Sequence, residues 1–203
     1  MKNPIHTALA WRERNPIFLD TETTALEGQI CDIAVVDLAG NVLLDTLVKP
    51  AWGIEDEARS VHGITDEMLA SAPPFETVWT QLREILRGRL VLIYNKDFDV
   101  HAICNSARDE RDDVTALWDE VFKFLRDGLT WQAACEIECV MELFATFYGD
   151  YSPRHGAYRW QSLALAARHF QIETPQNHRA LGDAQLARQV FLAMCESRDK
   201  EHA

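Results

Sequence analysis

The segment "PIFLDTETTAL" (Pro16 to Leu26) contains an apolar run that ends in two carboxylates, Asp20 and Glu22. The run predicts a short buried strand at residues 17–20. Because successive side chains point to opposite faces of a strand, the two carboxylates project to the same side. Two like charges held together repel each other. Either they lie in solvent, or a cation lies between them.

The rest of the chain predicts a layered α/β fold. Apolar or alternating runs predict four further strands, at residues 30–38, 41–50, 89–95 and 136–141. Apolar residues at helical spacing predict helices at residues 75–88, 98–111, 114–128, 160–170 and 178–200. The first three strands follow one another as a meander, and strands then alternate with helices. This order predicts a mixed five-stranded sheet flanked by helices.

Composition favours a globular protein with one domain, residues 1–203. The chain is 47% hydrophobic and 26% charged, and it contains no internal repeat or low-complexity linker. It lacks an apolar run of the roughly 18 residues that a membrane helix needs, and the N-terminus lacks the apolar core of a signal peptide. We therefore expect a cytoplasmic protein without a membrane partner.

Cysteine usage and net charge restrict the possible ligands. Five scattered cysteines indicate reduced thiols, and Cys135 and Cys139 lack a second Cys/His pair at the spacing of a zinc finger. The formal net charge of −12 opposes binding to phosphates. A nucleic-acid partner is therefore expected only if bound cations cancel part of this charge, or if the local potential differs from the average.

A second group of polar residues follows the fourth predicted strand in "YNKDFD" (residues 94–99). It places Asn95, Asp97 and Asp99 where a strand passes into a helix. Side chains of this kind often cap a helix N-terminus. One aspartate could cap the helix while the other points toward the end of the sheet, where ligands of α/β proteins commonly bind.

A third group lies in "HRALGDAQLA", in which His178 precedes Asp183 by five residues. Five helical steps separate two side chains by about 140° around the helix axis. The two residues can therefore face the same site only if His178 lies on the loop that leads into the helix. Taken alone, His178 could equally be an ordinary exposed histidine.

Together, "DTETTAL", "YNKDFD" and "HRALGD" resemble, in this order, the three motifs of the DEDDh 3′-5′ exonucleases. This family of proofreading exonucleases has a ribonuclease H-like fold. The segment "VHGIT" (residues 61–65) matches a further recurrent segment, and the resemblance extends from about Ile17 to Ala193. It implies a ribonuclease H-like fold for this chain.

The resemblance also implies a metal site and a base. Asp20, Glu22 and Asp183 would hold one divalent ion, Asp20 would also contact a second, and Asp99 would assist through water. His178 would be the general base. Hard oxygen ligands suit Mg²⁺ or Mn²⁺ better than zinc, and two such ions about 3.5–4 Å apart support phosphodiester hydrolysis. Asp97 receives no role.

For the substrate, the resemblance implies contacts with the 3′-terminal nucleotide. The corresponding residues are Thr23, Thr24 and Leu26 around the nucleotide, Val61, His62 and Phe98 at the base, and Glu57 near the sugar. Many family members have glycine where this chain has Ala25, so close approach of the backbone there is slightly restricted.

We therefore expect an enzyme that releases 5′-mononucleotides from the 3′ end of single-stranded DNA. An exonuclease acting on RNA or short oligoribonucleotides is the alternative within the same chemistry. A non-catalytic nucleic-acid-binding module with this fold is the alternative of another class, although such a module would be expected to have lost one of the motif residues. No polymerase domain follows the last predicted helix, so no obligate polymerase partner is expected.

One further segment, "SPRHGAYRWQ", places Arg154, His155 and Arg159 among Tyr158 and Trp160. Aromatic rings beside cations form the usual platform for single-stranded nucleic acid. The same residues could instead be a loop that leads to a capped helix start.

Overall fold

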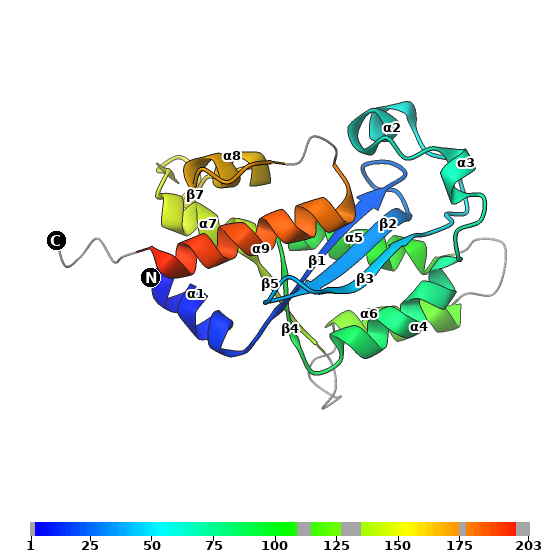
Figure 1. Cartoon of the computed structure of the whole chain (residues 1–203), viewed down its shortest axis with the longest axis horizontal. Helices are drawn as coiled ribbons and strands as arrows, with labels where there is room; N and C mark the ends of the chain where they lie inside the picture. The colour runs from blue at the N-terminus through cyan, green and yellow to red at the C-terminus, as the bar shows by residue number, and fades with distance from the viewer. Residues whose placement is uncertain (1–2, 109–114, 127–134, 175–177, 198–203) are drawn as a thin grey trace.

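The computed structural model describes residues 3–108, 115–126, 135–174 and 178–197. Within these residues a five-stranded sheet has the order β3-β2-β1-β4-β5 (Figure 1). β1 pairs antiparallel with β2 and parallel with β4, so the sheet is mixed, as predicted. The strands are β1 Ile17–Thr23, β2 Ile30–Asp37, β3 Val42–Leu47, β4 Leu90–Ile93 and β5 Glu136–Cys139.

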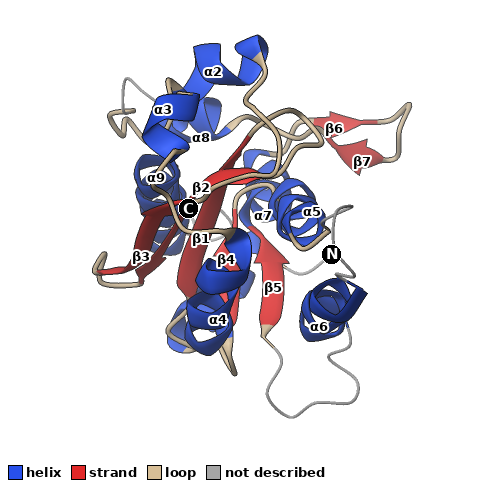
Figure 2. Cartoon of the chain, turned by 90° about the vertical axis from the view of Figure 1, so that its right-hand side faces the viewer, coloured by secondary structure: helices blue, strands red, loops and turns tan. Residues whose placement is uncertain are grey.

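Helices cover both faces of this sheet (Figures 1 and 2). They are α1 Pro4–Glu13, α2 Asp56–His62, α3 Asp66–Leu69, α4 Phe75–Leu86, α5 Lys96–Ser106, α6 Thr115–Arg126, α7 Val140–Tyr148, α8 Leu163–His169 and α9 Ala180–Glu196. Alternation along β1 explains the layers. Ile17 and Leu19 pack against α4, α5 and α6, whereas Phe18 packs against α1, α7, α8 and α9. Asp20 and Glu22 share the face of Phe18, which α9 crosses (Figure 1).

Two short segments flank the edge of the sheet at which β1 and β4 end (Figure 2). On one side stand α2 and α3. On the other is a hairpin of β6 (Tyr151–Ser152) and β7 (Ala157–Tyr158). The Tyr94 hydroxyl, directly after β4, donates to the carbonyl of Gln161 at 2.9 Å, which fixes the segment after the hairpin to this edge.

The structure confirms the five predicted strands, and it corrects the limits of several helices. The helix predicted at residues 178–200 begins at Ala180, because Arg179 has extended backbone angles (φ −143°, ψ 138°). The helix predicted to begin at residue 98 already begins at Lys96. The parts of predicted helices at residues 109–111, 114, 127–128 and 198–200 lie outside the described residues. Helices α1, α2, α3 and α7 were not predicted.

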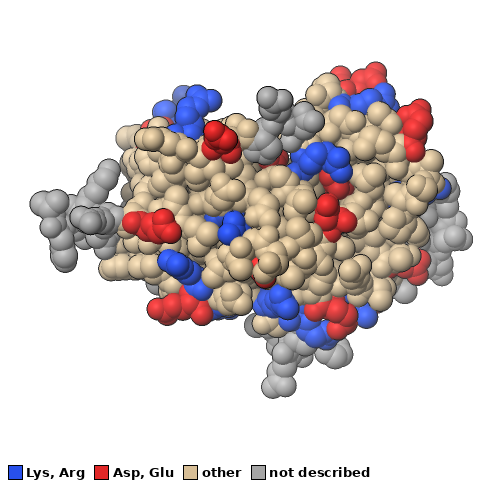
Figure 3. Space-filling view, in the orientation of Figure 1, with Lys and Arg blue, Asp and Glu red and all other residues tan. Residues whose placement is uncertain are grey.

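Surface properties agree with an ordinary globular fold. Basic and acidic side chains of the described residues are interspersed over the face that carries α9 (Figure 3). None of the helices within the described ranges has the length and apolar character required to span a membrane.

Candidate active site

Three carboxylates from the two ends of the chain meet where α9 crosses β1. One oxygen each of Asp20, Glu22 and Asp183 can be chosen so that all three lie within 4.8 Å of one another. β1 supplies two of them because alternate residues share a face. α9 supplies the third from its first turn. The structure therefore brings together three of the four carboxylates expected to hold metal.

Burial raises the proton affinity of the two carboxylates on β1. It raises the pKa of Asp20 well above its ordinary value, and the charges of Asp99 and Asp183 raise it further. The pKa of Glu22 rises to about 8, first through burial and then through the charge of Asp183. Without a cation, such a site retains protons at neutral pH. The observed donor set, three hard oxygen ligands that repel one another, fits Mg²⁺ or Mn²⁺.

Asp99 approaches β1 from the opposite helix layer. Its buried carboxylate accepts a hydrogen bond from the Thr21 hydroxyl at 2.8 Å. Burial raises the pKa of Asp99 to about 7, although the bond from Thr21 lowers it. Asp99 is not one of the three carboxylates grouped among the described residues, but its charge acts on Asp20.

The expectation that Asp97 or Asp99 caps a helix is wrong. Both aspartates lie inside the first turn of α5, and Asn95 occupies the N-cap without a side-chain capping bond. The amides of Phe98 and Asp99 instead donate to the carbonyl of Asn95. The Asp97 side chain is exposed, and its role stays unassigned.

His178 lies on the loop that leads into α9, where the spacing required it to be. Its Nδ1 and the Oδ2 of Asp183 are 2.9 Å apart, and this hydrogen bond raises the pKa of His178. The side chain is 60% exposed. When the neutral ring donates from Nδ1, Nε2 keeps a lone pair that can accept a proton from water.

The loop after Glu22 is held tightly by its own backbone. The pairing of β1 with β2 shifts register between Glu22 and Thr23, and the chain then turns away from the sheet. The Thr24 amide donates to the Gln29 carbonyl at 2.8 Å, and the Gln29 amide donates to the Thr24 hydroxyl at 3.1 Å. A Cβ at Gly28 would lie 2.4 Å from the Ala25 nitrogen, so the turn requires glycine.

Leu26 projects from the tip of this loop, 84% exposed. An apolar side chain fixed on a rigid turn can contact a nucleobase without a large cost in ordering. Val61 and Glu57 are also exposed, on the neighbouring α2, whereas Phe98 is half-buried. These residues remain predicted substrate contacts.

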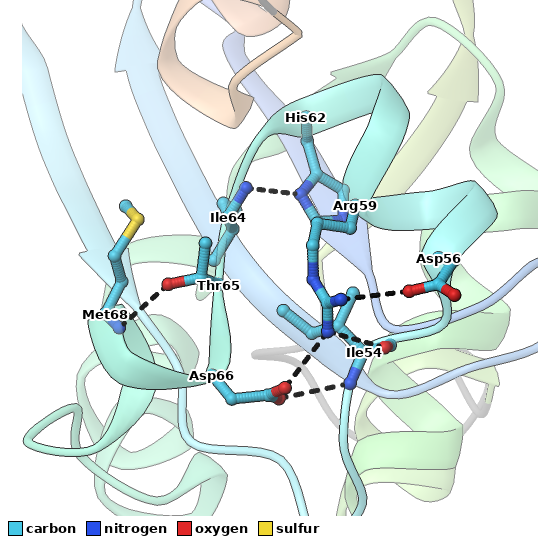
Figure 4. A network of polar contacts seen from close by, with 8 residues as sticks. All are labelled: Ile54, Asp56, Arg59, His62, Ile64, Thr65, Asp66 and Met68. Atoms are coloured by element: carbon cyan, nitrogen blue, oxygen red, sulfur yellow. Dashed lines mark hydrogen bonds and ion pairs between the residues drawn. The ribbon is translucent and has the colours of Figure 1, made fainter.

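His62 is buried beside the loop after Glu22, and its contact with a base stays a prediction. Its ring is 4% exposed, Nε2 lies 3.2 Å from the Thr23 carbonyl oxygen, and Nδ1 accepts from the Ile64 amide at 3.0 Å (Figure 4). The ring therefore supports the backbone of the loop after Glu22. In the same region, Arg59 forms ion pairs with Asp56 and Asp66 (Figure 4).

Three residues beside the site were not predicted from the sequence: Thr21, Asp32 and Arg179. Thr21 bonds Asp99, as described above. Asp32 lies across from Glu22 in the register of β1 and β2, and its Oδ2 accepts from Nε of Arg179 at 2.7 Å. In the sequence, Thr21 is a hydroxyl residue between two acidic residues, and Asp32 is a charged residue within an apolar strand. Neither signal identifies its partner.

The segment "SPRHGAYRWQ" begins at the β6–β7 hairpin. The rings of Tyr151 and Tyr158 meet edge to face with centroids 5.4 Å apart, and Trp160 is 66% exposed. Ser162 caps α8, because its hydroxyl accepts from the Leu165 amide. The expected capped helix start is thus present, and contact with nucleic acid stays a prediction.

Comparison with known proteins identifies the class of molecule that this fold and site define. The model of the exonuclease family (RNase T) matches residues 17–191. The chain belongs to this family, and it is a 3′-5′ exonuclease of the DEDDh type.

Two relatives illustrate the similarity. The uncharacterised exonuclease CP81 of Escherichia phage 186 is 32% identical over 192 residues, covering 93% of this chain and 92% of that protein. DNA polymerase III subunit epsilon of Pasteurella multocida is 29% identical over 192 residues, covering 88% of this chain and 67% of that subunit.

Solved structures show the same fold with different nucleic acids. Exonuclease X in complex with 5′-overhanging duplex DNA has a TM-score of 0.60 at 23% identity, covering 89% of this chain and 92% of that chain. A 3′-exonuclease that recognises the histone mRNA stem-loop has a TM-score of 0.62 at 15% identity, covering 91% and 64%. The fold alone therefore does not distinguish DNA from RNA.

Proposed function

We propose that this exonuclease removes nucleotides one at a time from the 3′ end of single-stranded DNA and releases 5′-mononucleotides. The observation that carries the proposal is the meeting of Asp20, Glu22 and Asp183 with His178 bonded to the third carboxylate. These groups would act on a phosphodiester at the end of β1, beside the exposed Leu26.

The carboxylates would hold two divalent ions, Mg²⁺ or Mn²⁺. Asp20, Glu22 and Asp183 form the core of this set, and Asp99 would support it from the other helix layer. Bound there, the ions supply positive charge that offsets the phosphate charge and lowers the pKa of water. The protein contributes their placement, because three of the four ligands lie on β1 and α9, which pack directly on each other.

His178 would take the proton of the attacking water. It must be neutral to do so, and the hydrogen bond to Asp183 both orients the ring and raises its pKa. Activity should therefore rise with pH as the ring loses its proton. The exposed position of His178 leaves Nε2 accessible to water.

Substrate would be held as a chain end. The turn from Thr23 to Gln29 would lie against the terminal nucleotide, with Leu26 and Val61 at the base and Glu57 near the sugar. A paired terminus must first be separated, at a cost of about a few kcal/mol, so single strands should be degraded faster than blunt duplexes.

DNA is the proposed substrate because relatives that align over most of this chain are named as subunits of DNA polymerase III. RNA is the second candidate, favoured by the shared fold of the histone mRNA exonuclease. The choice depends on whether the pocket accepts a 2′-hydroxyl.

The test uses DNA and RNA oligonucleotides of one sequence, labelled at the 5′ end, with Mg²⁺ or with chelator. We expect a descending ladder from DNA with a free 3′-hydroxyl, strong protection of a 3′-phosphate, and no cleavage with chelator. Faster degradation of RNA would reverse the choice of substrate. Cleavage of a circular single strand would contradict the exonuclease mechanism.

A further inference from the structure

An ion pair between a buried carboxylate and a half-exposed arginine links the loop of His178 to the sheet. Asp32, on β2, is 1% exposed, and its Oδ2 accepts from Nε of Arg179 at 2.7 Å. The same oxygen also accepts from the Ala180 amide at 3.3 Å. Ala180 is the first residue of α9, whose N-cap has no side-chain capping bond of its own. Asp32, on β2, therefore accepts a hydrogen bond from the first amide of α9, which no side chain of the N-cap residue binds.

Stabilisation of the fold is a poor explanation for the ion pair between Asp32 and Arg179. Burying a carboxylate costs several kcal/mol, and solvent weakens its attraction to Arg179, whose side chain is 39% exposed. In addition, Oδ1 of Asp32 is buried without a hydrogen-bond partner among the described residues.

The position of the pair explains it better. Arg179 is extended, so its side chain and that of His178 leave the backbone in opposite directions. His178 turns to Asp183 while Arg179 turns to Asp32. The carbonyl of Arg179 also accepts from the Asp183 amide at 3.0 Å. Asp32 in turn lies across the strand pair from Glu22.

We propose that Asp32 and Arg179 are positioning residues, which set His178 relative to the carboxylates of Asp20, Glu22 and Asp183. The inference rests on the proposed role of His178 as the base. Arg179 acts through His178, because it anchors the one peptide that joins the loop to α9. Asp32 supplies the anchor on the strand adjacent to β1. Neither residue needs to touch the substrate.

The test is a double-mutant cycle on hydrolysis rates, measured in single turnovers with excess enzyme on 5′-labelled single-stranded DNA. Misplacing a catalytic group by about 1 Å can cost roughly 10²-fold in rate. We expect Arg179→Leu to lower the maximal rate by about 10- to 100-fold and to change KM by less than about 3-fold. In a His178→Ala background, the same change should cost less than about 3-fold, because the group it positions is gone.

Arg188 is a matched control on the same helix. It donates from Nε to the Leu38 carbonyl at 2.9 Å and also contacts the Ala39 carbonyl, so it ties α9 to the turn after β2, away from the site. Arg188→Leu should lower thermal stability and leave the rate within about 2-fold of the wild type. If lower stability alone caused the loss of rate, Arg179→Leu and Arg188→Leu would lose rate equally. That result would overturn the proposal.

Arg179→Leu leaves the buried carboxylate of Asp32 unpaired, and this variant could fail to fold for that reason. In that case, two variants of Asp32 provide the test. Asp32→Ala removes the anchor without leaving a buried charge, and it should repeat the loss of rate and its dependence on His178. Asp32→Asn retains an oxygen acceptor and should keep most of the rate. Equal losses in the presence and absence of His178 would refute positioning. An inactive wild type would instead refute the proposed function.

Discussion

Replacing Glu22 by glutamine should make the metal-free enzyme more stable at alkaline pH while abolishing its activity. The pKa of Glu22 is about 8 in the folded chain, chiefly because of burial and then because of the charge of Asp183, against an ordinary value of 4.5. As pH rises through this interval, the unfolded chain releases the proton and the folded chain retains it. Stability is therefore fully present below about pH 4.5 and is lost as pH rises toward 8.

The size of the effect follows from the same values. One pKa unit corresponds to about 1.4 kcal/mol, so the difference between 8 and 4.5 sets an upper bound of roughly 5 kcal/mol. Glu22 is partly exposed, and solvent screening reduces this to about 2–3 kcal/mol. For a chain of this length, each kcal/mol shifts Tm by roughly 2–4 °C. Glu22→Gln should therefore raise Tm at pH 8 by roughly 4–12 °C.

The assay is thermal unfolding with chelator from pH 5 to pH 8.5. We expect the difference in unfolding temperature between Glu22→Gln and the wild type to be small at pH 5 and to widen steadily up to pH 8, with the variant higher. Added Mg²⁺ should stabilise the wild type more than the variant, because binding to the folded state adds to its stability. Exposed Glu173→Gln is the control and should change neither profile. A folded Glu22→Gln protein that is no more stable than the wild type at pH 8 with chelator would refute the reasoning.

Further predictions concern the groups around Glu22. Asp20→Asn and Asp183→Asn should each slow hydrolysis by roughly 10³-fold or more while the protein stays folded by circular dichroism; near-normal, chelator-sensitive activity would contradict the metal site. His178→Ala should cost about 10²–10⁴-fold and flatten the acid limb of the pH–rate profile, and an unchanged acid limb would assign the proton to another group. Thr21→Val should destabilise the fold by about 1–3 kcal/mol in urea unfolding because it removes the bond to buried Asp99. Thr21→Ser keeps the hydroxyl and should not, so equal effects of the two substitutions would exclude the hydrogen bond as the cause.

The sheet was predictable because its signals are local. β1 and β4 are short apolar runs, and a turn joins β2 and β3 directly. The condition that His178 must lie on a loop to face the same site as Asp183 also needed only the 3.6-residue period of a helix and the distance between the two residues along the chain. The structure agrees on both counts.

The missed helices lack such signals. α1 buries only Ile5 and Ala8, so its sequence has little apolar periodicity. α7 begins directly after β5, with Cys139 at the N-cap and no side-chain capping bond, so the apolar run passes from strand to helix without a break. Local pattern cannot place that boundary.

The missed parts of the site depend on contacts between distant segments. Asp32 and Arg179 are separated by 147 positions, and only the packing of α9 across β2 makes them neighbours. The buried setting of His62 likewise depends on how α2 and α3 fold back toward Thr23. Composition and spacing do not contain this information.

The meeting of β1 and α9 also has a consequence for synthesis of the protein. Asp20 and Glu22 emerge from the ribosome early, whereas His178 and Asp183 emerge only near the end of the described chain. A nascent chain that has not yet exposed α9 lacks two of the five motif residues, and the sheet face of Phe18 lacks the helix that packs on it. Translation thus delays assembly of the proposed hydrolytic site until α9 has left the ribosome. Before that point, the nascent chain should not cut nucleic acid around the ribosome.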